Sequence, residues 1–350
     1  MAIKYDRGFI HNGLFCVMIL VTGGTGIVGT RLIFDLLQDG NHVRATKRAS
    51  SDLEFSKRVF QFYSKKDGES LFKKIEWVNI DLEDIYSIRE HMVGITRVYH
   101  TAGLVSYRKA DEAKLLATNY VGTQNLVNIC LEFEIEKLCH VSSVAALGAH
   151  RSQMPADEDS TWKKSKSNSN YAFSKYLAER EVWRGTAEGL AAVIVNPSII
   201  LAPSKPHQSS GAMMDMLMKG ISFYPPGTTG LVDVADVSKA SIKLMTSDIE
   251  NRRFVLNAEN LSYKELLETA ADIFDNNKPR YEAKYWMLKL YQWIEGARSL
   301  ITGKPSEVTA ETVRNAFTQK KFSNSRAVKE LEINFTSVRE TLLKYRAFYL

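Results

Sequence analysis

The chain has 350 residues, of which 45% are hydrophobic and 25% charged, as in an ordinary globular protein. This composition excludes disordered, collagen-like and coiled-coil proteins, and the length suggests about two domains of roughly 100 to 200 residues. The net charge is +6, but lysine and arginine are spread along the chain in short groups such as Lys163-Lys164. We therefore expect a solvated basic surface and no nucleic-acid partner.

The three cysteines, Cys16, Cys130 and Cys139, are too few to stabilise a chain of this length through disulfide bonds. A reducing compartment is therefore expected, and we predict a cytoplasmic protein. Cys139-His140 follows Cys130 by nine residues, which fits no common metal-binding spacing. We therefore predict no metal site.

The amino-terminal region is predicted to be a leader outside the fold. Its longest apolar run, Leu14 to Val21, is far shorter than the roughly 20 residues of a membrane-spanning helix. His11-Asn12-Gly13 precedes this run and glycines follow it without an A-x-A cleavage site, so we predict no signal peptide. Residues 1–17 are expected to be disordered, with Met18 as an alternative start of translation.

Strand and helix patterns alternate through the first two hundred residues. A short apolar run at Met18–Val21 ends at glycines, and apolar residues then recur at helical spacing over Ile27–Leu37. Further buried strands are predicted at His42–Thr46, Ile75–Val78, Val98–His100, Lys137–Val141 and Ala192–Asn196. Such alternation predicts βαβ units and a mainly parallel sheet.

The pattern changes after Pro197. Proline-rich loops are predicted between residues 203 and 227, followed by short helices. Arg253–Asn257 is predicted to be one more strand. Ser262 and Glu265 then form a capping box that opens a helix.

A glycine-rich run, Thr22–Gly29, lies between the first predicted strand and the first predicted helix. It fits GxGxxG through Gly24, Gly26 and Gly29, or GxxGxxG through Gly23, Gly26 and Gly29. A dinucleotide site needs glycines here for a tight turn, for close approach of a pyrophosphate and for helix-on-strand packing. The helix N-terminus would then offer N–H groups to the phosphates.

These patterns predict an α/β fold with a doubly wound parallel sheet of the Rossmann type and a smaller, mostly helical carboxyl-terminal domain. Residues 18–196 plus 232–258 are assigned to the cofactor-binding domain. Residues 197–231 plus 259–350 are assigned to the substrate-binding domain.

Cations occupy the place where an NAD site usually has an acid. The end of the second predicted strand reads Arg44-Ala45-Thr46-Lys47-Arg48, with no carboxylate to bind a ribose 2′-hydroxyl. Lys47 and Arg48 would instead attract a 2′-phosphate, unless both simply face water. NADP is therefore predicted as the preferred cofactor, with NAD as the alternative.

Tyr171 and Lys175 lie four residues apart on one face of a predicted helix. A neighbouring cation and an oxidised nicotinamide would lower the pKa of the tyrosine, which ordinarily titrates near 10. Such a pair is also common on solvated helices. Here, however, it follows a candidate strand, Leu138–Val141, that ends in Ser142 and Ser143 at the carboxyl edge of the sheet, where open α/β sheets bind ligands.

In these motifs the sequence resembles an extended short-chain dehydrogenase/reductase. This superfamily contains nucleotide-sugar epimerases and dehydratases, dihydroflavonol reductases and 3β-hydroxysteroid dehydrogenases. The resemblance spans Met18 to about Val255. It is carried by TGGTGIVG at 22–29, Asp81, HTAG at 100–103, Asn119, SSVAALG at 142–148, YAFSK at 171–175, NPSIILAP at 196–203 and VDVADV at 232–237. The sequence departs from the family pattern at Ala202, where a glycine is usual.

The resemblance implies a role for each matching residue. Ser143 would polarise a substrate carbonyl, with Ser142 the less favoured hydroxyl, Tyr171 would pass the proton, and Lys175 would bind the nicotinamide ribose. Asn119 would support the site as a helix residue. The residues implied to bind the cofactor are Gly23, Thr25, Gly26, Ile27, Gly29, Lys47, Arg48, Asp81, Leu82, Thr101, Ala102, Gly103, Tyr171, Lys175, Pro197 and Ile199.

The resemblance implies an NAD(P)-dependent oxidoreductase that interconverts a carbonyl and a secondary alcohol on a small organic substrate. Val193–Ser198 lacks the Arg-Tyr-x-Asn stretch of the sugar-nucleotide enzymes and, like Val43–Arg48, favours the dihydroflavonol reductase and 3β-hydroxysteroid dehydrogenase branch. A nucleotide-sugar epimerase or dehydratase and a non-catalytic NAD(P) sensor are the alternatives.

Substrate contacts are expected from Leu104–Lys109, Val144–His150 and Leu201–Gly230, which would surround the nicotinamide end of the cofactor. Tyr285–Ile301 is rich in Tyr, Trp and Leu and is interpreted as the core face of a helix, in preference to a membrane or substrate contact. Membrane contact is therefore not expected. A homodimer is expected only by analogy with the family.

Overall fold

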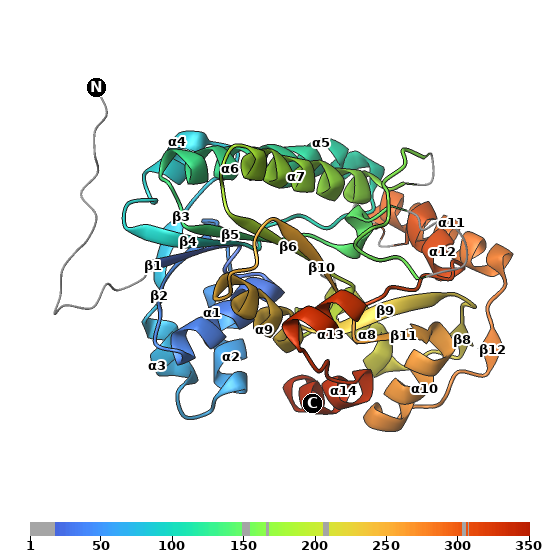
Figure 1. Cartoon of the computed structure of the whole chain (residues 1–350). Coiled ribbons are helices and arrows are strands. Elements are labelled where there is room, and N and C mark those ends of the chain that lie inside the picture. Colours follow the sequence, from blue (N-terminus) through green and yellow to red (C-terminus); the bar gives the residue numbers. More distant parts are fainter. Residues whose placement is uncertain (1–17, 149–154, 166–167, 206–209, 303–305, 307) are drawn as a thin grey trace.

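The computed structural model describes residues 18–148, 155–165, 168–205, 210–302, 306 and 308–350 (Figure 1). The predicted leader lies outside these residues, as do parts of two of the expected substrate loops, at 149–150 and 206–209. The described chain forms a large parallel sheet flanked by helices and a smaller region of helices and short strands.

Seven strands of the described chain form one parallel sheet in the order β10-β6-β5-β4-β1-β2-β3. They are β1 (Met18–Thr22), β2 (His42–Lys47), β3 (Glu76–Asn79), β4 (Ile95–His100), β5 (Lys137–Val141), β6 (Ala192–Pro197) and β10 (Arg252–Leu256). Every residue of β5 and β6 is buried, as expected for strands covered on both faces. The α/β class predicted from the sequence is confirmed.

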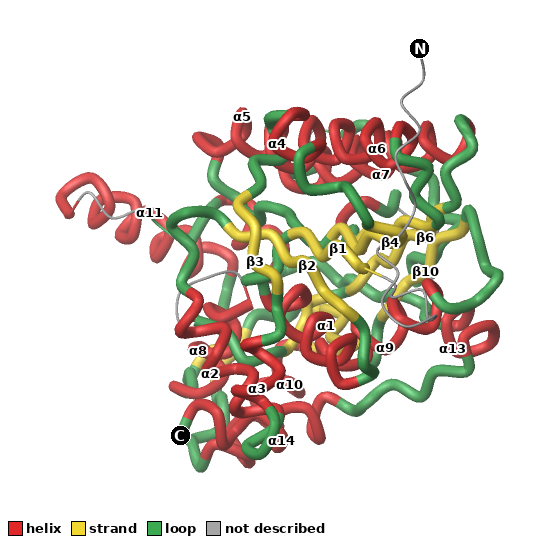
Figure 2. Tube along the Cα trace, turned by 90° about the vertical axis from the view of Figure 1, so that its left-hand side faces the viewer, coloured by secondary structure: helices red, strands yellow, loops and turns green. Residues whose placement is uncertain are grey.

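Helices cover both faces of this sheet (Figures 1 and 2). One layer contains α1 (Ile27–Gln38), α2 (Leu53–Tyr63), α3 (Gly68–Lys73) and α9 (Val234–Met245), and the other contains α4 (Ile85–Arg89), α5 (Glu112–Leu115), α6 (Gly122–Glu132) and α7 (Asn170–Ala187). Each layer has its own core. Leu32 and Leu244 are buried on the first face, and Leu126 and Val182 on the second.

The carboxyl-terminal region contains more strands than the sequence predicts. β7 (Ile199–Leu201), β9 (Thr228–Asp233) and β11 (Glu259–Ser262) form a three-stranded sheet, and β8 (Phe223–Tyr224) pairs with β12 (Tyr281–Glu282). The helices of this region are α8 (Ser210–Lys219), α10 (Tyr263–Phe274), α11 (Tyr285–Thr302), α12 (Ala310–Ala316), α13 (Ser325–Leu331) and α14 (Val338–Tyr349). The prediction of loops over residues 203–227 is therefore wrong at α8 and β8, whereas the strand predicted at Arg253–Asn257 is confirmed as β10.

The capping box predicted at α10 is confirmed. The backbone N–H of Glu265 donates to the Ser262 hydroxyl at 3.2 Å, and the Glu265 carboxylate accepts from the Ser262 N–H at 2.8 Å. Two unsatisfied donors at the helix start are thereby paired with local acceptors.

The interpretation of Tyr285–Ile301 as a core face is wrong. The segment is helical, but most of its large apolar side chains face solvent, with Trp293 79% and Ile301 86% exposed. Helical spacing shows that the apolar residues share a face, but it does not show what that face meets.

The two regions interleave in the chain and in the core. Helix α9 and strand β10, both from residues 232–258, pack with the large sheet. Helix α13 contacts α9 and β10, and Tyr345 of α14 lies in the same buried cluster as the α1 residues. Part of residues 259–350 therefore packs against the cofactor-binding domain, although the sequence pattern assigned these residues to the substrate-binding domain.

The sheet order places a ligand site at the carboxyl ends of β1 and β4. From β1 the chain proceeds through β2 to β3 on one side, and then crosses to β4, β5 and β6 on the other. Open parallel sheets bind ligands in the crevice where the strand order reverses in this way. The glycine turn and the motifs that follow β4 and β5 lie at this edge.

Candidate active site

The turn after β1 requires glycine at two positions. Gly23 has φ +68, and a Cβ there would lie 2.7 Å from the Ala102 backbone. A Cβ on Gly29 would lie 2.3 Å from the Gly23 carbonyl oxygen. These constraints fit the Gly23, Gly26, Gly29 spacing, because the tight turn and the close helix packing fall at its first and last glycines.

The start of α1 is suited to an anion. Gly26 is the N-cap residue and provides no side-chain hydrogen bond, so the first-turn N–H groups, from Ile27 onward, are available to a phosphate. The turn is supported from β4, where the Thr101 hydroxyl donates to the Thr22 carbonyl at 2.6 Å. Thr25, beside Gly26, donates its hydroxyl to Ser51 at 3.4 Å.

The end of β2 lies beside the glycine turn. The Gly24 N–H donates to the Thr46 carbonyl and the Gly23 N–H to the Thr46 hydroxyl, both at 3.0 Å. Lys47 follows and donates to Asn79 Oδ1 at 3.1 Å, while Arg48 is exposed. Both predicted cations therefore follow Thr46, the residue through which the end of β2 is hydrogen bonded to the glycine turn.

Asp81 and Leu82 lie just after β3. The Asp81 carboxylate accepts the Glu83 N–H at 3.0 Å, and its own N–H donates to the Ser87 hydroxyl. Leu82 is buried, and its carbonyl accepts a hydrogen bond from Asn125 of α6. The two residues therefore occupy a fixed loop at the carboxyl edge, on the β2–β3 side of the crevice.

Ser143, Tyr171 and Lys175 converge at the end of β5. Tyr171 and Lys175 are buried on one face of α7, and the Lys175 ammonium donates to the Val141 carbonyl at 2.9 Å. The Ser143 hydroxyl is hydrogen bonded to the Tyr171 side chain, and this contact lowers the pKa of Tyr171 against the larger, opposite effect of burial. Ser143 is also the N-cap of the short 3₁₀ turn Val144–Ala146, which fixes its position.

Burial shifts the pKa values of both Tyr171 and Lys175. It lowers the pKa of Lys175 to about 8, an effect that nearby Glu179 opposes. Burial also raises the pKa of Tyr171, and the hydrogen bond from Ser143 opposes this rise. The predicted lowering of the Tyr171 pKa by its neighbouring cation is therefore not seen in the chain alone. The buried phenol is protonated near neutral pH.

Gly103 and Asn119 form the opposite wall of the same site. A Cβ on Gly103 would lie 3.4 Å from the Lys175 nitrogen and 3.5 Å from Asn119 Oδ1. Asn119 is buried in a π-helical turn, Leu116–Val121, and binds both backbone groups of Leu104 as well as the Ser174 hydroxyl. π-Turns of this kind often occur at functional sites. Gly103 therefore lies next to Lys175 and Asn119, and a methyl group there would be in ordinary van der Waals contact with both side chains.

Glu179 lies one helical turn from Lys175 and was not among the site residues predicted from the sequence. Its carboxylate is 2% exposed and accepts hydrogen bonds from Ser142 and Asn196, both at 2.5 Å, and from Arg253 at 3.2 Å. Ser142 therefore binds within this network, while Ser143 is next to Tyr171. No local motif indicates Glu179, although its i+4 spacing from Lys175 places it on the same helix face.

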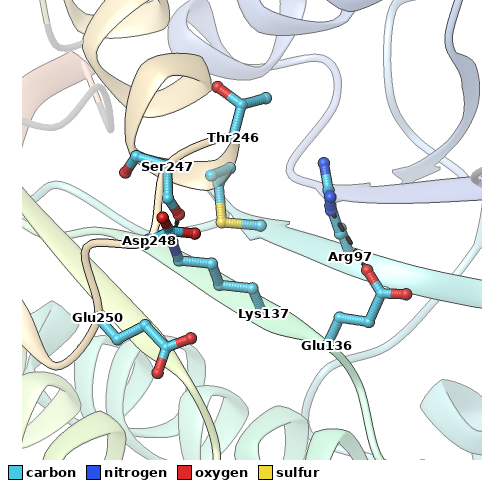
Figure 3. A pocket seen from close by; sticks show the side chains of 8 residues that line it. Arg97, Glu136, Lys137, Thr246, Ser247, Asp248 and Glu250 are labelled. Atoms are coloured by element: carbon cyan, nitrogen blue, oxygen red, sulfur yellow. Dashed lines mark hydrogen bonds and ion pairs between the residues drawn. The ribbon is translucent and has the colours of Figure 1, made fainter.

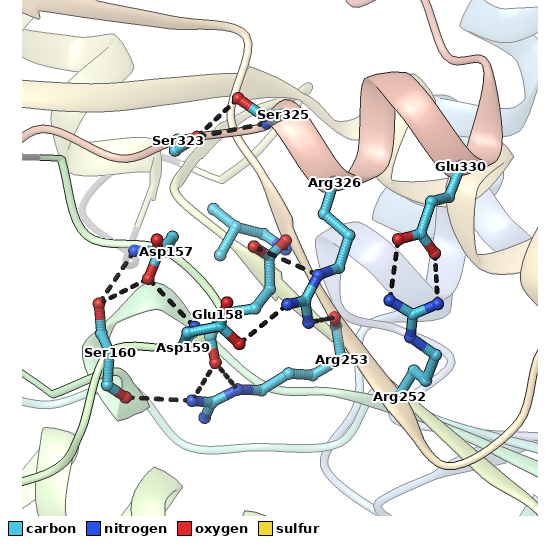
Figure 4. Close-up of polar contacts among 11 residues, drawn as sticks. Asp157, Glu158, Asp159, Ser160, Arg252, Arg253, Ser323, Ser325, Arg326 and Glu330 are labelled. Carbon is cyan, nitrogen blue, oxygen red and sulfur yellow. Dashed lines mark hydrogen bonds and ion pairs between the residues drawn. The ribbon is translucent and has the colours of Figure 1, made fainter.

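Arg253 connects this network to the carboxyl-terminal region (Figure 4). Its guanidinium donates to the Glu158 carbonyl at 2.6 and 2.8 Å and to the Ser160 carbonyl at 3.1 Å. Arg326 of α13 binds Asp159 at 2.9 Å. These contacts hold residues 157–160 against β10 and help to fix the base of the site.

Residues from three segments lie near Tyr107. The Tyr107 ring, which belongs to the predicted substrate loop 104–109, packs against Tyr171 with ring centroids 5.9 Å apart. Burial raises the pKa of Tyr107, and the nearby Tyr171, Glu311 of α12 and Tyr263 of α10 raise it further. No sequence signal linked α12 to this site. Pro197 and Ile199 lie at the end of β6 and the start of β7, on the same edge.

A cavity of about 240 Å³ lies at the opposite, amino-terminal edge of the sheet (Figure 3). It is lined by polar residues that include Arg97 and Lys137. The Lys137 ammonium donates to the carbonyls of Leu244 and Ser247, each at 2.7 Å, and so caps the end of α9. Lys137 therefore has a structural role, which accounts for its presence in the wall of this cavity.

Two features are absent from the described residues. They contain no group of three or more His, Cys, Asp and Glu side chains arranged to hold a metal ion. Nor does any helix in this part of the chain combine the length and apolarity needed to cross a bilayer.

The fold and the site define an NAD(P)-dependent enzyme of the reductase or epimerase class. A model of the NAD dependent epimerase/dehydratase family matches residues 19–256, and the chain belongs to this family.

Two relatives and one solved structure are similar to this chain. A putative dihydroflavonol 4-reductase of Synechocystis is 29% identical over 328 residues, covering 92% of this chain and 91% of the relative. Sterol demethylase protein B of Methylococcus capsulatus is 29% identical over 263 residues, covering 75% and 76%. The structure of Thermus thermophilus UDP-glucose 4-epimerase with NAD matches with a TM-score of 0.69 at 20% identity, covering 93% and 97%. The resemblance to extended short-chain dehydrogenases near the dihydroflavonol reductase branch is thus confirmed.

Proposed function

We propose that the protein is an NAD(P)-dependent reductase that interconverts a carbonyl group and a secondary alcohol on a small organic substrate. The observation that carries this proposal is the convergence of Ser143, Tyr171 and Lys175 at the carboxyl edge of the sheet, with Gly103 beside Lys175. This arrangement offers a proton donor, a second hydrogen-bond donor and a cation to one reacting oxygen and a neighbouring ribose.

The residues present fit a nicotinamide dinucleotide. The glycine turn and the α1 N-terminus suit the pyrophosphate, and Asp81 lies on the side where the adenine would bind. When bound, the nicotinamide would supply or accept the hydride. Lys175, beside Gly103, would hold the ribose hydroxyls.

In the reductive direction, Ser143 and Tyr171 donate hydrogen bonds to the substrate carbonyl oxygen. Negative charge develops on that oxygen, and these donors stabilise it. Tyr171 then transfers its proton to the oxygen, which is consistent with a buried phenol that is protonated near neutral pH. The Lys175 cation stabilises the resulting phenolate.

The reductase assignment rests on sequence as well as geometry. The more similar curated relatives include a putative dihydroflavonol reductase, and the Val193–Ser198 stretch lacks the sugar-nucleotide pattern. The Tyr107 ring beside Tyr171 offers an aromatic wall to an organic substrate. The Thermus epimerase supports the fold alone, at 20% identity.

The test is turnover by a Tyr171→Phe variant. Wild-type protein is screened with ketones, aldehydes and nucleotide sugars, with NADPH and NADH absorbance recorded and sugar products analysed by NMR. The variant is expected to lose at least about 10²-fold in kcat while still binding the cofactor, because general acid catalysis contributes about 10² to 10⁴. Tyr176→Phe, a half-buried tyrosine on the same helix, is the control.

Three results would reject this assignment. Near-normal turnover in Tyr171→Phe rejects the acid–base role. Epimerised or dehydrated sugar products without carbonyl reduction favour the epimerase or dehydratase alternative. Cofactor binding without any turnover favours a sensor.

Cofactor choice is proposed to depend on Lys47 and Arg48, which favour the 2′-phosphate of NADPH. Arg48→Glu should weaken NADPH binding by at least about tenfold and leave NADH binding nearly unchanged, because only NADPH carries a charge at that position. Isothermal titration with both cofactors measures the two affinities. Unchanged NADPH affinity would refute the assignment of Arg48.

A further inference from the structure

Helix α11 carries a solvent-exposed apolar surface that the proposed reaction does not use. We call Trp286, Leu290, Trp293, Ile294 and Ile301 the α11 face. Each of these side chains is more than half exposed. In Figure 2 part of the helix extends beyond the rest of the described chain. The exposed fractions of these five side chains show that no described element covers them.

The α11 face is continuous along the helix. Its members follow one another at intervals of four, three, one and seven residues. At about 100° per residue they occupy an arc of roughly 100° on one side of the helix. Contacts with the body come from elsewhere on the helix, since the Tyr285 ring packs against Phe317 with centroids 5.3 Å apart. The exposed stripe is therefore a coherent surface.

The charges around this face are mainly positive. Between residues 284 and 302 the sequence has three cations, Lys284, Lys289 and Arg298, and a single carboxylate, Glu295. Lys289 and Arg298 fall on opposite flanks of the face at helical spacing. Glu295 points away from the face, is paired with Arg298 at 2.6 Å and has a side chain only 16% exposed. Because Arg298 is paired with Glu295, Lys289 supplies the uncompensated positive charge on the rim of the face. Three cations and one carboxylate give residues 284–302 a net charge of +2, so an approaching surface meets a basic rim.

We propose that α11 docks this protein onto the surface of a bilayer that contains anionic phospholipid. Tryptophan is favoured at the boundary between lipid headgroups and acyl chains, and flanking lysine and arginine are attracted to anionic headgroups. A second copy of the chain fits less well. Two such helices packed face to face would bring basic rims together without exposed carboxylates to pair with them. This docking does not depend on the reaction proposed above.

Vesicle co-sedimentation tests the proposal with the full-length chain. Wild-type protein should bind vesicles of phosphatidylcholine mixed with phosphatidylglycerol, and should bind pure phosphatidylcholine vesicles more weakly. Trp286→Ser combined with Trp293→Ser should lower binding at least about tenfold, because the interfacial aromatic anchors are lost. Lys289→Glu should lower binding to the anionic vesicles alone, by at least about fivefold.

Tyr86→Ser on α4 is the matched control, because Tyr86 is also an exposed aromatic residue, at 68%, on a different part of the molecule. It should leave vesicle binding unchanged. Far-ultraviolet circular dichroism and cofactor binding confirm that each variant is folded. Failure of the wild type to bind anionic vesicles, or wild-type binding by the double tryptophan variant, would overturn the proposal. A dimer in sedimentation equilibrium that Trp293→Ser dissociates, without lipid binding, would assign the face to a second copy instead.

Discussion

Lys175→Met should make the folded protein more stable at neutral pH while it abolishes turnover. Lys175 is buried, and burial lowers its pKa from 10.5 to about 8. Holding the charged form in the folded state therefore costs about 3 kcal/mol. Methionine has a similar length, fills the same space and carries no charge. Its one structural cost is the lost hydrogen bond to the Val141 carbonyl, of about 1 to 2 kcal/mol.

The pH dependence separates these two effects. The folded-state pKa lies below the unfolded value, so the destabilisation by the charged amine is complete below about pH 8. It decreases as pH rises from 8 to 10.5, where the unfolded chain binds more protons than the folded one, and it is absent above 10.5. The lost hydrogen bond does not depend on pH. Lys175→Met should therefore be about 1 to 2 kcal/mol more stable than wild type at pH 7, and no more stable at pH 10.5.

Urea denaturation of both proteins, followed by circular dichroism from pH 6.5 to 10.5, measures this difference. Other titrating groups are common to the two chains. Burial, the larger cause, and the Lys175 charge lower the pKa of His100 to about 3, so this imidazole is neutral from pH 6.5 to 10.5. A stability difference that stays constant over this range would show that Lys175 is not held as a costly buried cation. The reasoning about the site would then be wrong.

Two further substitutions test the supports of the site. Gly29→Ala should weaken cofactor binding by more than about tenfold with the fold retained, because the new methyl group would displace the Gly23 carbonyl. Calorimetric titration measures the affinity, and Gly296→Ala is the control because a methyl group there meets open space. Equal cofactor affinity of the Gly29 variant and wild type would contradict the prediction. Glu179→Gln should lower the free energy of unfolding by about 3 kcal/mol, since Arg253 loses a buried partner. Urea titration checks this value against exposed Glu188→Gln, and matching curves for the two variants would disprove it.

The sequence was sufficient for the parts of the site that are local in the chain. The glycine turn depends on spacing within eight residues, and Tyr171 and Lys175 share a helix face because they are four residues apart. The parallel sheet followed from apolar runs separated by helical patterns, because buried parallel strands are apolar on both sides. These features need no knowledge of distant contacts.

Features that depend on distant partners could not be predicted. Glu179 is held by Ser142, Asn196 and Arg253, which come from three other strands or strand ends, and nothing near Glu179 in sequence indicates them. Strand β9 is fully buried although it begins Thr-Thr-Gly, so its composition resembles a loop. The exposure of α11 depends on what surrounds the helix, which hydrophobic periodicity does not report.

The final helix has a consequence for engineering. The Tyr345 hydroxyl donates to Asp233 at 2.5 Å and the Lys344 ammonium at 3.1 Å, so α14 fastens the end of β9 just before α9 begins. A shortened recombinant chain that stops after β10 would leave Asp233 without these donors and would open the α1 side of the interior to water. Chimeras that exchange substrate specificity with a relative should therefore retain α14 and replace only the loops between β10 and α14.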